Sequence, residues 1–121
     1  MPKEILVVDD QPGIRLLLTD ILTSEGHQVT LASTGKEALD KIHQASFDLI
    51  ILDYKLPIID GKEVLNQLEN EKVKTPVIVM SGMAESISGE METRRIVRCT
   101  IAKPFNVMDL CTNVRNIFIT H

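Results

Sequence analysis

Four short apolar runs in this 121-residue chain are each followed at once by polar residues whose types suit phosphoryl chemistry. The residues that follow the runs are Asp9 and Asp10, Asp53, Ser81 and Lys103. Three carboxylates cannot lie close together in ionised form without a compensating positive charge. A hard divalent cation is the natural compensation, and Mg²⁺ is favoured because it binds through one or two carboxylates and accepts phosphate oxygens.

With a cation bound, the set still contains the ammonium of Lys103 and the hydroxyl of Ser81, the partners that a phosphoryl group needs. The set therefore predicts a site that holds a phosphoryl group on an aspartate. Asp53 is the expected nucleophile because the run before it lies on the central strand, between the other groups. The metal and Lys103 would stabilise charge on the transferring oxygens. If Asp53 stood alone, it would be interpreted as a turn residue. Because all four apolar runs end in residues suited to phosphoryl transfer, a functional role is favoured.

The segment 53–61 predicts a loop that shapes this site. Pro57 restricts the loop and favours an extended residue before it, so that the backbone carbonyl of Lys55 is expected to face the metal. The bond between Lys103 and Pro104 can be cis at modest cost, and a cis bond here would direct the Lys103 side chain toward the acids.

Five segments are expected to form strands: residues 5–8, 29–32, 49–52, 77–80 and 99–102. Three are continuous apolar runs, which are typical of parallel strands covered by helices on both faces. Apolar residues at helical spacing fill the gaps, with start signals at Pro12, at the capping box 34–37 and at Asn106. The pattern predicts an α/β fold, a (βα)5 doubly wound parallel sheet in the flavodoxin-like order 2-1-3-4-5. In that order strands one and three are neighbours, so their acids meet at one crevice.

The fourth helix is the weakest of the expected elements. Met83, Ile87 and Met91 have helical spacing, but Ser86 and Gly89 are poor interior residues. We expect residues 84–96 to be short, frayed or mobile.

Composition excludes several classes of protein. With 13 basic and 17 acidic residues the formal net charge is −4, which disfavours a protein that binds nucleic acid through phosphate contacts. No apolar run approaches the roughly 20 residues of a membrane span, and residues 1–4 do not begin a signal peptide. Cys99 and Cys111 are expected to be buried, reduced thiols of a cytoplasmic protein. Residues 1–121 are expected to form one domain with no output domain.

Four motifs, taken together and in order, resemble the receiver domain of two-component response regulators along essentially the whole chain. The motifs are residues 7–11, 53–61, 81–82 and 103–105. Among receivers, the chain is most similar to the single-domain intermediates of sporulation phosphorelays in endospore-forming bacteria. That closer resemblance rests on residues 11–15, on Lys55 and on the expected lack of an output domain.

The resemblance implies a role for each residue of the site. Asp53 would be phosphorylated, Lys103 would pair with the phosphoryl group, and Ser81 would be the hydroxyl that moves toward it. Asp10, Asp53 and the Lys55 carbonyl would bind Mg²⁺, or Mn²⁺ as an alternative, with Asp9 contributing directly or through water. The protein would catalyse only its own phosphorylation and dephosphorylation.

The implied partners are a sensor histidine kinase, which donates from a phosphohistidine, and a histidine phosphotransferase that takes the group onward. No nucleic acid or membrane is implied, and the chain is expected to be a monomer. The residues expected to dock these partners lie beside the crevice: Gln11, Gly13, Ile14, Leu17, Pro104 and Phe105. For Leu17 the periodicity favours the core instead, and for Ile14 the two interpretations are balanced.

The chain departs from the family pattern at three places. Thr100 stands where many receivers have an aromatic residue that rotates with the switch hydroxyl, so output by that route is not expected. Residues 96–97 replace a common Gly-Ala pair, and Ile58 stands where small residues are common. A relay protein needs only to present its aspartate, and so tolerates weak switching.

Three other functions use parts of the same pattern. A Mg²⁺-dependent phosphohydrolase with an aspartyl phosphate usually has an acid two residues after the nucleophile, where this chain has Lys55. A flavin carrier of this fold class needs a hydroxyl- and glycine-rich loop where Asp9 and Asp10 would repel phosphate. A receiver-like module that binds partners without phosphorylation would not need the complete set of acids.

Overall fold

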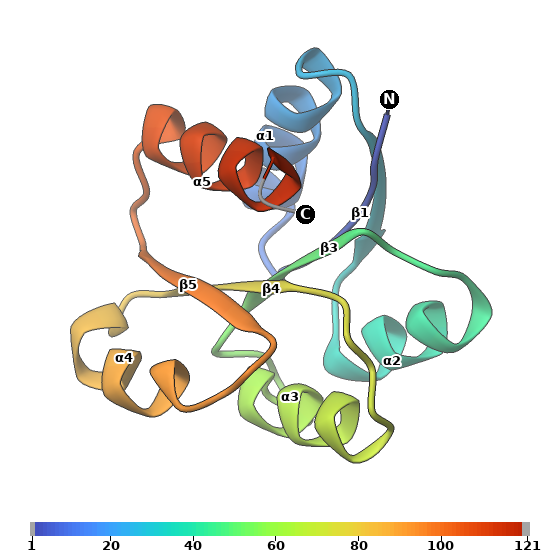
Figure 1. Cartoon of the computed structure of the whole chain (residues 1–121), viewed down its shortest axis with the longest axis vertical. Coiled ribbons are helices and arrows are strands. Elements are labelled where there is room, and N and C mark those ends of the chain that lie inside the picture. The colour runs from blue at the N-terminus through green and yellow to red at the C-terminus, as the bar shows by residue number, and fades with distance from the viewer. Residues whose placement is uncertain (1, 120–121) are drawn as a thin grey trace.

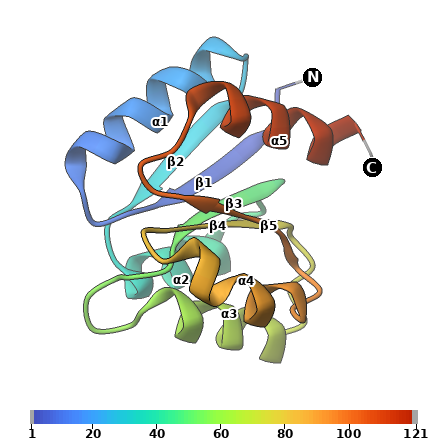
Figure 2. The same cartoon turned by 90° about the vertical axis from the view of Figure 1, so that its left-hand side faces the viewer.

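The computed structural model describes residues 2–119, except for the side chains of residues 84 and 85. It is a parallel sheet of five strands in the order β2-β1-β3-β4-β5, which confirms the predicted topology. The elements in chain order are β1 (Glu4–Val8), α1 (Pro12–Ser24), β2 (Gln28–Ala32), α2 (Gly35–Gln44), β3 (Leu49–Asp53), α3 (Gly61–Asn70), β4 (Val77–Ser81), α4 (Ala84–Glu92), β5 (Val97–Ala102) and α5 (Val107–Ile119). Helices α1 and α5 cover one face of the sheet, and α2, α3 and α4 cover the other (Figures 1 and 2).

The two faces of the sheet carry separate apolar clusters, because successive side chains of a strand point to opposite faces. Ile5 and Val7 of β1 pack with Leu18 of α1, whereas Leu6 and Val8 pack toward α2 and α3. Every residue of β3 and β4 is buried. Apart from Asp53 and Ser81 at their carboxyl ends, these two strands are apolar, because both of their faces are covered.

Local signals fix where the helices begin and end. Pro12 occupies the first turn of α1, and Gly26 follows the end of that helix at a φ of +91°, which glycine adopts without strain. The Thr34 hydroxyl accepts a bond from the Glu37 N–H at 3.0 Å, and Asp60 caps α3 in the same way. The capping box predicted at residues 34–37 thus starts α2, and Asp60 starts α3.

Helix α4 is short, as predicted, with nine residues and no side-chain cap at Met83. Ile87 and Met91 are buried and face the sheet. After the helix, Arg94 forms ion pairs with Glu69 of α3 and with Glu90 of α4. Charge pairs therefore join α4 to α3, in addition to its apolar contacts.

Two expectations about burial were wrong. Leu17 was favoured as a core residue but is 41% exposed, because α1 turns only Leu18 and Leu22 fully toward the sheet. The thiols of Cys99 and Cys111 are free but only partly buried; Cys99 lies on β5, which is an edge strand. Within residues 2–119, no helix has the length and apolar character needed to cross a bilayer.

Candidate functional site

Polar side chains gather at the ends of β1, β3, β4 and β5, on the edge of the sheet where the parallel strands finish. Asp9, Asp53 and Ser81 are 1%, 5% and 3% exposed, and are the buried polar residues of the described chain. Carboxylate oxygens of Asp9, Asp10 and Asp53 lie within 4.8 Å of one another. The topology explains this convergence, because β1 pairs directly with β3 and so places their terminal acids side by side.

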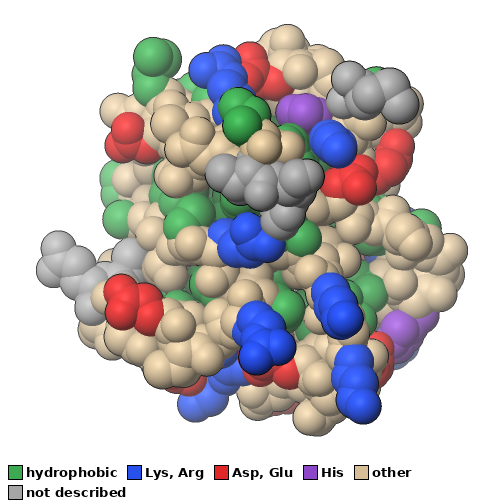
Figure 3. Space-filling model, viewed as in Figure 1, with side chains coloured by type: hydrophobic (Ala, Val, Ile, Leu, Met, Phe, Trp, Pro, Cys, Tyr) green, Lys and Arg blue, Asp and Glu red, His purple; other side chains and the backbone are tan. Residues whose placement is uncertain are grey.

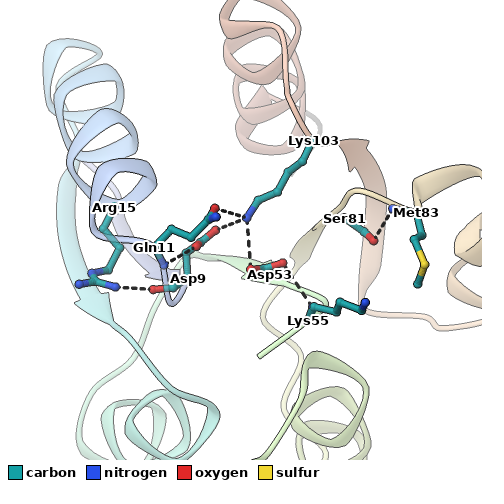
Figure 4. A network of polar contacts seen from close by, with 8 residues as sticks. All are labelled: Asp9, Gln11, Arg15, Asp53, Lys55, Ser81, Met83 and Lys103. Atoms are coloured by element: carbon teal, nitrogen blue, oxygen red, sulfur yellow. Dashed lines mark hydrogen bonds and ion pairs between the residues drawn. The ribbon is translucent and has the colours of Figure 1, made fainter. Parts of the chain in front are cut away.

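Lys103 reaches into this group of acids from the end of β5 (Figure 4). Its Nζ donates to Asp9 Oδ2 at 2.7 Å, to Asp53 Oδ2 at 3.2 Å and to Gln11 Oε1 at 3.4 Å. The Lys103–Pro104 peptide bond is cis, the isomer expected to direct the Lys103 side chain toward the acids. The Lys103 N–H also donates to the carbonyl of Ser81 at 3.0 Å, which fixes the start of the loop.

The charges of these acids and of Lys103 are incompletely balanced. Burial raises the pKa of Asp53, and the charge of Asp9 raises it further, while Lys103 opposes both. Burial alone would lower the pKa of Lys103, but its bonds and charge interactions with Asp9 and Asp53 outweigh that effect, and the net direction is upward. One ammonium therefore faces three carboxylates, a surplus of negative charge.

These residues fit a hard divalent cation. The ligand atoms on offer are carboxylate oxygens gathered from two neighbouring strand ends, and Mg²⁺ prefers oxygen ligands and retains waters. The buried, partly uncompensated charge of Asp53 supports the same conclusion, because a cation would relieve the repulsion from Asp9. The Lys55 N–H donates to Asp53 Oδ1 at 3.3 Å, so the Lys55 backbone lies against the site. The role of the Lys55 carbonyl as a metal ligand stays a prediction.

Ser81 is close to the group but is not bonded to it. Its hydroxyl accepts a bond from the Met83 N–H at 2.9 Å, at the start of α4 (Figure 4). The sequence correctly placed Ser81 at a strand end, but gave no indication that its oxygen is already engaged by the backbone two residues on.

Two further contacts hold the end of β1. Asp9 Oδ1 accepts a bond from the Gln11 N–H at 2.9 Å, and Arg15 Nη1 donates to the Asp9 carbonyl at 2.7 Å. Sequence reasoning gave Arg15 no role at the site, although its place one turn into α1 puts it within reach of the preceding loop. A Cβ at Gly61 would lie 2.6 Å from the Asp53 carbonyl oxygen, so α3 starts against β3 only with glycine there.

The expected docking residues divide into two groups. Gln11, Gly13, Leu17 and Pro104 are exposed. Ile14 and Phe105 are partly buried and pack against the cluster beneath α1 and α5, so each contributes to the core as well as to the surface. Leu16, beside Leu17, is 64% exposed and extends the exposed apolar surface of α1.

Comparison with known proteins identifies the family. Residues 5–115 match the response regulator receiver domain, and the chain belongs to this family. It is 34% identical over 112 residues to Sporulation initiation phosphotransferase F of Bacillus subtilis, covering 91% of this chain and 89% of that protein. It is also 36% identical to the transcriptional regulatory protein PhoP of the same organism, covering 97% of this chain but only 49% of the relative. The chain thus spans about half the length of such regulators.

Solved structures give the same fold. The receiver domain of the Francisella response regulator 1452 has a TM-score of 0.89 with 27% identity, and 98% of each chain is covered. The response regulator TrrA of Thermotoga maritima, solved in complex with Mg²⁺ and BeF, has a TM-score of 0.84 with 33% identity, covering 95% of this chain and 98% of that one. Receiver domains are phosphoacceptor signalling modules that interact with histidine kinases or phosphotransfer partners.

Proposed function

We propose that this protein is a single-domain response regulator that accepts a phosphoryl group on Asp53 from a sensor histidine kinase and passes it to a histidine phosphotransferase. The observation that carries this proposal is the buried carboxylate of Asp53 between Asp9 and the ammonium of Lys103. A buried acid with a raised pKa that is also bonded to a cation is typical of a functional group.

Asp10, Asp53 and the Lys55 carbonyl are the residues that would hold Mg²⁺, with Asp9 as a further ligand, direct or through water. When bound, the ion supplies positive charge that stabilises the oxygens of the transferring group. Its affinity for oxygen ligands matches the carboxylates that the crevice supplies.

The residues of the chain supply the nucleophile and its electrostatic surroundings. A carboxylate oxygen of Asp53 forms a bond to phosphorus while the bond from phosphorus to the imidazole nitrogen breaks, and the electron pair of that bond stays on the imidazole. Lys103 Nζ already donates to Asp53 Oδ2 and is placed to follow negative charge onto the phosphoryl oxygens. The Ser81 hydroxyl, released from Met83, would donate to one of them.

The onward transfer reverses these bond changes with a different histidine. The similarity to Sporulation initiation phosphotransferase F, which the chain covers over 89% of its length, supports a relay role and suggests sporulation as the process. We propose that residues 1–121 act as one receiver, in a cytoplasmic monomer with free cysteines.

The partner would dock over α1 and the loop before α5, which border the crevice. Gln11, Gly13, Leu17 and Pro104 expose their surfaces there, while Ile14 and Phe105 support that surface from below. A protein that carries a phosphohistidine must approach this closely, because Asp53 is only 5% exposed.

The test is labelling of the purified protein with phosphoramidate in the presence of Mg²⁺, followed by intact mass. One phosphoryl group should be added to the wild-type chain and none to Asp53→Asn, while Asp20→Asn, an exposed acid of α1, should be labelled normally. Continuous hydrolysis of phosphate monoesters by the wild-type protein would favour a phosphohydrolase and contradict the proposal.

A further inference from the structure

Ile58 has an unusual backbone conformation beside the crevice. Its φ is +68°, in the left-handed region, and its side chain is 96% exposed. A β-branched residue at positive φ is a genuine outlier, since its branched side chain collides with the backbone there. Residues strained in this way cluster at functional sites.

The loop around Ile58 holds this conformation firmly. The Ile59 N–H donates to the Pro57 carbonyl at 2.8 Å, which closes a three-residue γ-turn centred on Ile58, and the form of this turn with positive φ is rare and strained. The loop is closed at its base by the Gly61 N–H, which donates to the Tyr54 carbonyl at 2.9 Å. The turn is therefore pinned between two backbone contacts.

Folding does not account for isoleucine at this position. Ile58 belongs to neither apolar cluster, so its side chain adds nothing to the core. Glycine would adopt the same φ without strain, and a polar residue would avoid exposing an aliphatic side chain to water. The isoleucine thus combines backbone strain with an exposed aliphatic side chain, and no contact of that side chain with either apolar cluster compensates for them.

The place of Ile58 indicates which partner makes that contact. The loop starts at the residue after Asp53 and leads into α3, on the face of the sheet opposite to α1 (Figure 2). Leu16 and Leu17 of α1 expose apolar surface on one side of Asp53, and Ile58 does so on the other. A protein that brings a phosphohistidine to a buried Asp53 must press against both sides.

We propose that Ile58 is a specificity-determining contact, an apolar knob that enters a hollow on the phosphohistidine-bearing partner. This inference rests on the proposed function, because it names how the partner of the same site is recognised. Burial of Ile58 in the complex removes an exposed aliphatic side chain from water. The pinned turn holds the side chain ready, so little conformational freedom is lost on docking.

The opposite end of the molecule offers a second candidate surface, and it is weaker. The face at which the strands begin carries several Lys and Arg side chains (Figure 3), and Lys72, Lys74 and Arg95 line a hollow there. Lys72 and Arg95 follow the ends of α3 and α4, where cations already stabilise the helix dipoles. That surface needs no partner to explain it, whereas Ile58 does.

The experiment compares two donors on the full chain with Mg²⁺. Phosphoramidate reaches Asp53 without a protein surface, whereas sensor kinases from the same genome, autophosphorylated with ATP, must dock first. Ile58→Asn keeps a residue that tolerates left-handed backbone but removes the aliphatic side chain, and Ile58→Leu keeps it. Ile119→Asn is the matched control, because Ile119 is also an exposed isoleucine, 78% exposed at the end of α5.

We expect Ile58→Asn to slow transfer from the kinase that phosphorylates the wild type fastest by about tenfold to a hundredfold, the factor that burial of one aliphatic side chain confers. Ile58→Leu should stay within about threefold of wild type, and all variants should be labelled equally by phosphoramidate. Ile58→Asn should also have a higher midpoint of unfolding, because the strain at Ile58 is relieved.

Other outcomes overturn the inference. Equal slowing with both donors would show that Ile58 shapes the loop for chemistry, and no slowing with the kinase would show that Ile58 is not contacted. If Ile119→Asn slows the transfer to the same extent, the effect is not specific to Ile58. If the wild type self-associates and Ile58→Asn does not, Ile58 contacts a second copy of this chain rather than the kinase. Failure of phosphoramidate to label even the wild type would instead overturn the proposed function.

Discussion

The two groups that flank Asp53 on the β4 and β5 side are prepared in opposite ways. The Lys103 ammonium is already bonded to both Asp9 and Asp53, and its side chain is only 16% exposed. Ser81 lies on β4, the strand next to that of Asp53, but its hydroxyl accepts a bond from the Met83 N–H instead. The charge partner is therefore in place before any phosphoryl group arrives, whereas the hydroxyl must turn to take part.

Lys103 and Ser81 are therefore expected to contribute to different properties, Lys103 to stability and Ser81 to signalling. Lys103 compensates buried charge in the resting protein, so its loss is felt at once in the free energy of unfolding. Ser81 is tied to the first turn of α4, so a change in its partner is transmitted to that helix. Thr100 is half-buried on β5 and offers no aromatic ring to rotate. The Ser81–Met83 bond is a direct link from the site to the start of α4.

The largest effect is expected from Lys103→Met, which removes the built-in charge partner. Asp9 and Asp53 would be left buried without their cation, and we expect the free energy of unfolding at pH 7 without metal to fall by about 3 kcal/mol. Phosphoramidate labelling should slow by about a hundredfold or more, since charge on the transferring oxygens loses its stabilising ammonium. Urea denaturation and the rate of mass increase measure the two effects.

Lys36→Met is the matched control for that variant. Lys36 pairs with Asp40 at 3.3 Å on the exposed surface of α2, where such a pair contributes less than about 0.5 kcal/mol. Similar destabilisation by the two substitutions would mean that the crevice is no more sensitive to lost charge than the surface, and would contradict the account of Lys103.

A smaller effect is expected for Asp10→Ala, which tests the metal rather than the ammonium. Asp10 is the exposed member of the three acids, so its removal should leave the fold intact while lowering Mg²⁺ affinity by about tenfold to a hundredfold. Calorimetric titration with Mg²⁺ measures the change, and Asp20→Ala on α1 is the control. Unchanged affinity would exclude Asp10 from the metal site.

Asp53→Asn tests the incomplete charge balance through pH. Because the pKa of Asp53 is raised on folding, its ionisation costs stability, and this cost appears as pH rises through that pKa. In EDTA the variant should be more stable than wild type at pH 7. The difference should shrink as pH falls and the wild-type carboxylate is protonated. A variant less stable than wild type at pH 7 would show that Lys103 already overcompensates the acids.

The convergence of the acids and Lys103 was predictable because it depends on topology. Continuous apolar runs indicated parallel strands, and parallel strands end at one edge, so Asp9, Asp53 and Lys103 had to meet there. The hydroxyl of Ser81 was not predictable in this way, because it rotates about one bond and selects among nearby partners. The exposure of Leu17 also escaped prediction, because helical spacing identifies an apolar face but not how far round the helix the neighbours reach.

The smallest effect is expected at Ser81 itself, where it reports on signalling rather than stability. Ser81→Ala removes one bond to the Met83 N–H and should cost about 1 kcal/mol. In the wild type, phosphorylation should speed hydrogen exchange at the Met83 amide, because the Ser81 hydroxyl leaves that amide for the phosphoryl group. In Ser81→Ala the Met83 amide should exchange fast even without phosphorylation. Phosphorylation of this variant should therefore not change the exchange rate. Ser86→Ala, which removes a hydroxyl that donates to the Met83 carbonyl at 2.9 Å, is the control and should preserve the response. A Met83 amide that stays equally protected in phosphorylated wild-type protein would mean that Ser81 keeps its resting partner, and that the two sides of Asp53 do not differ in mobility.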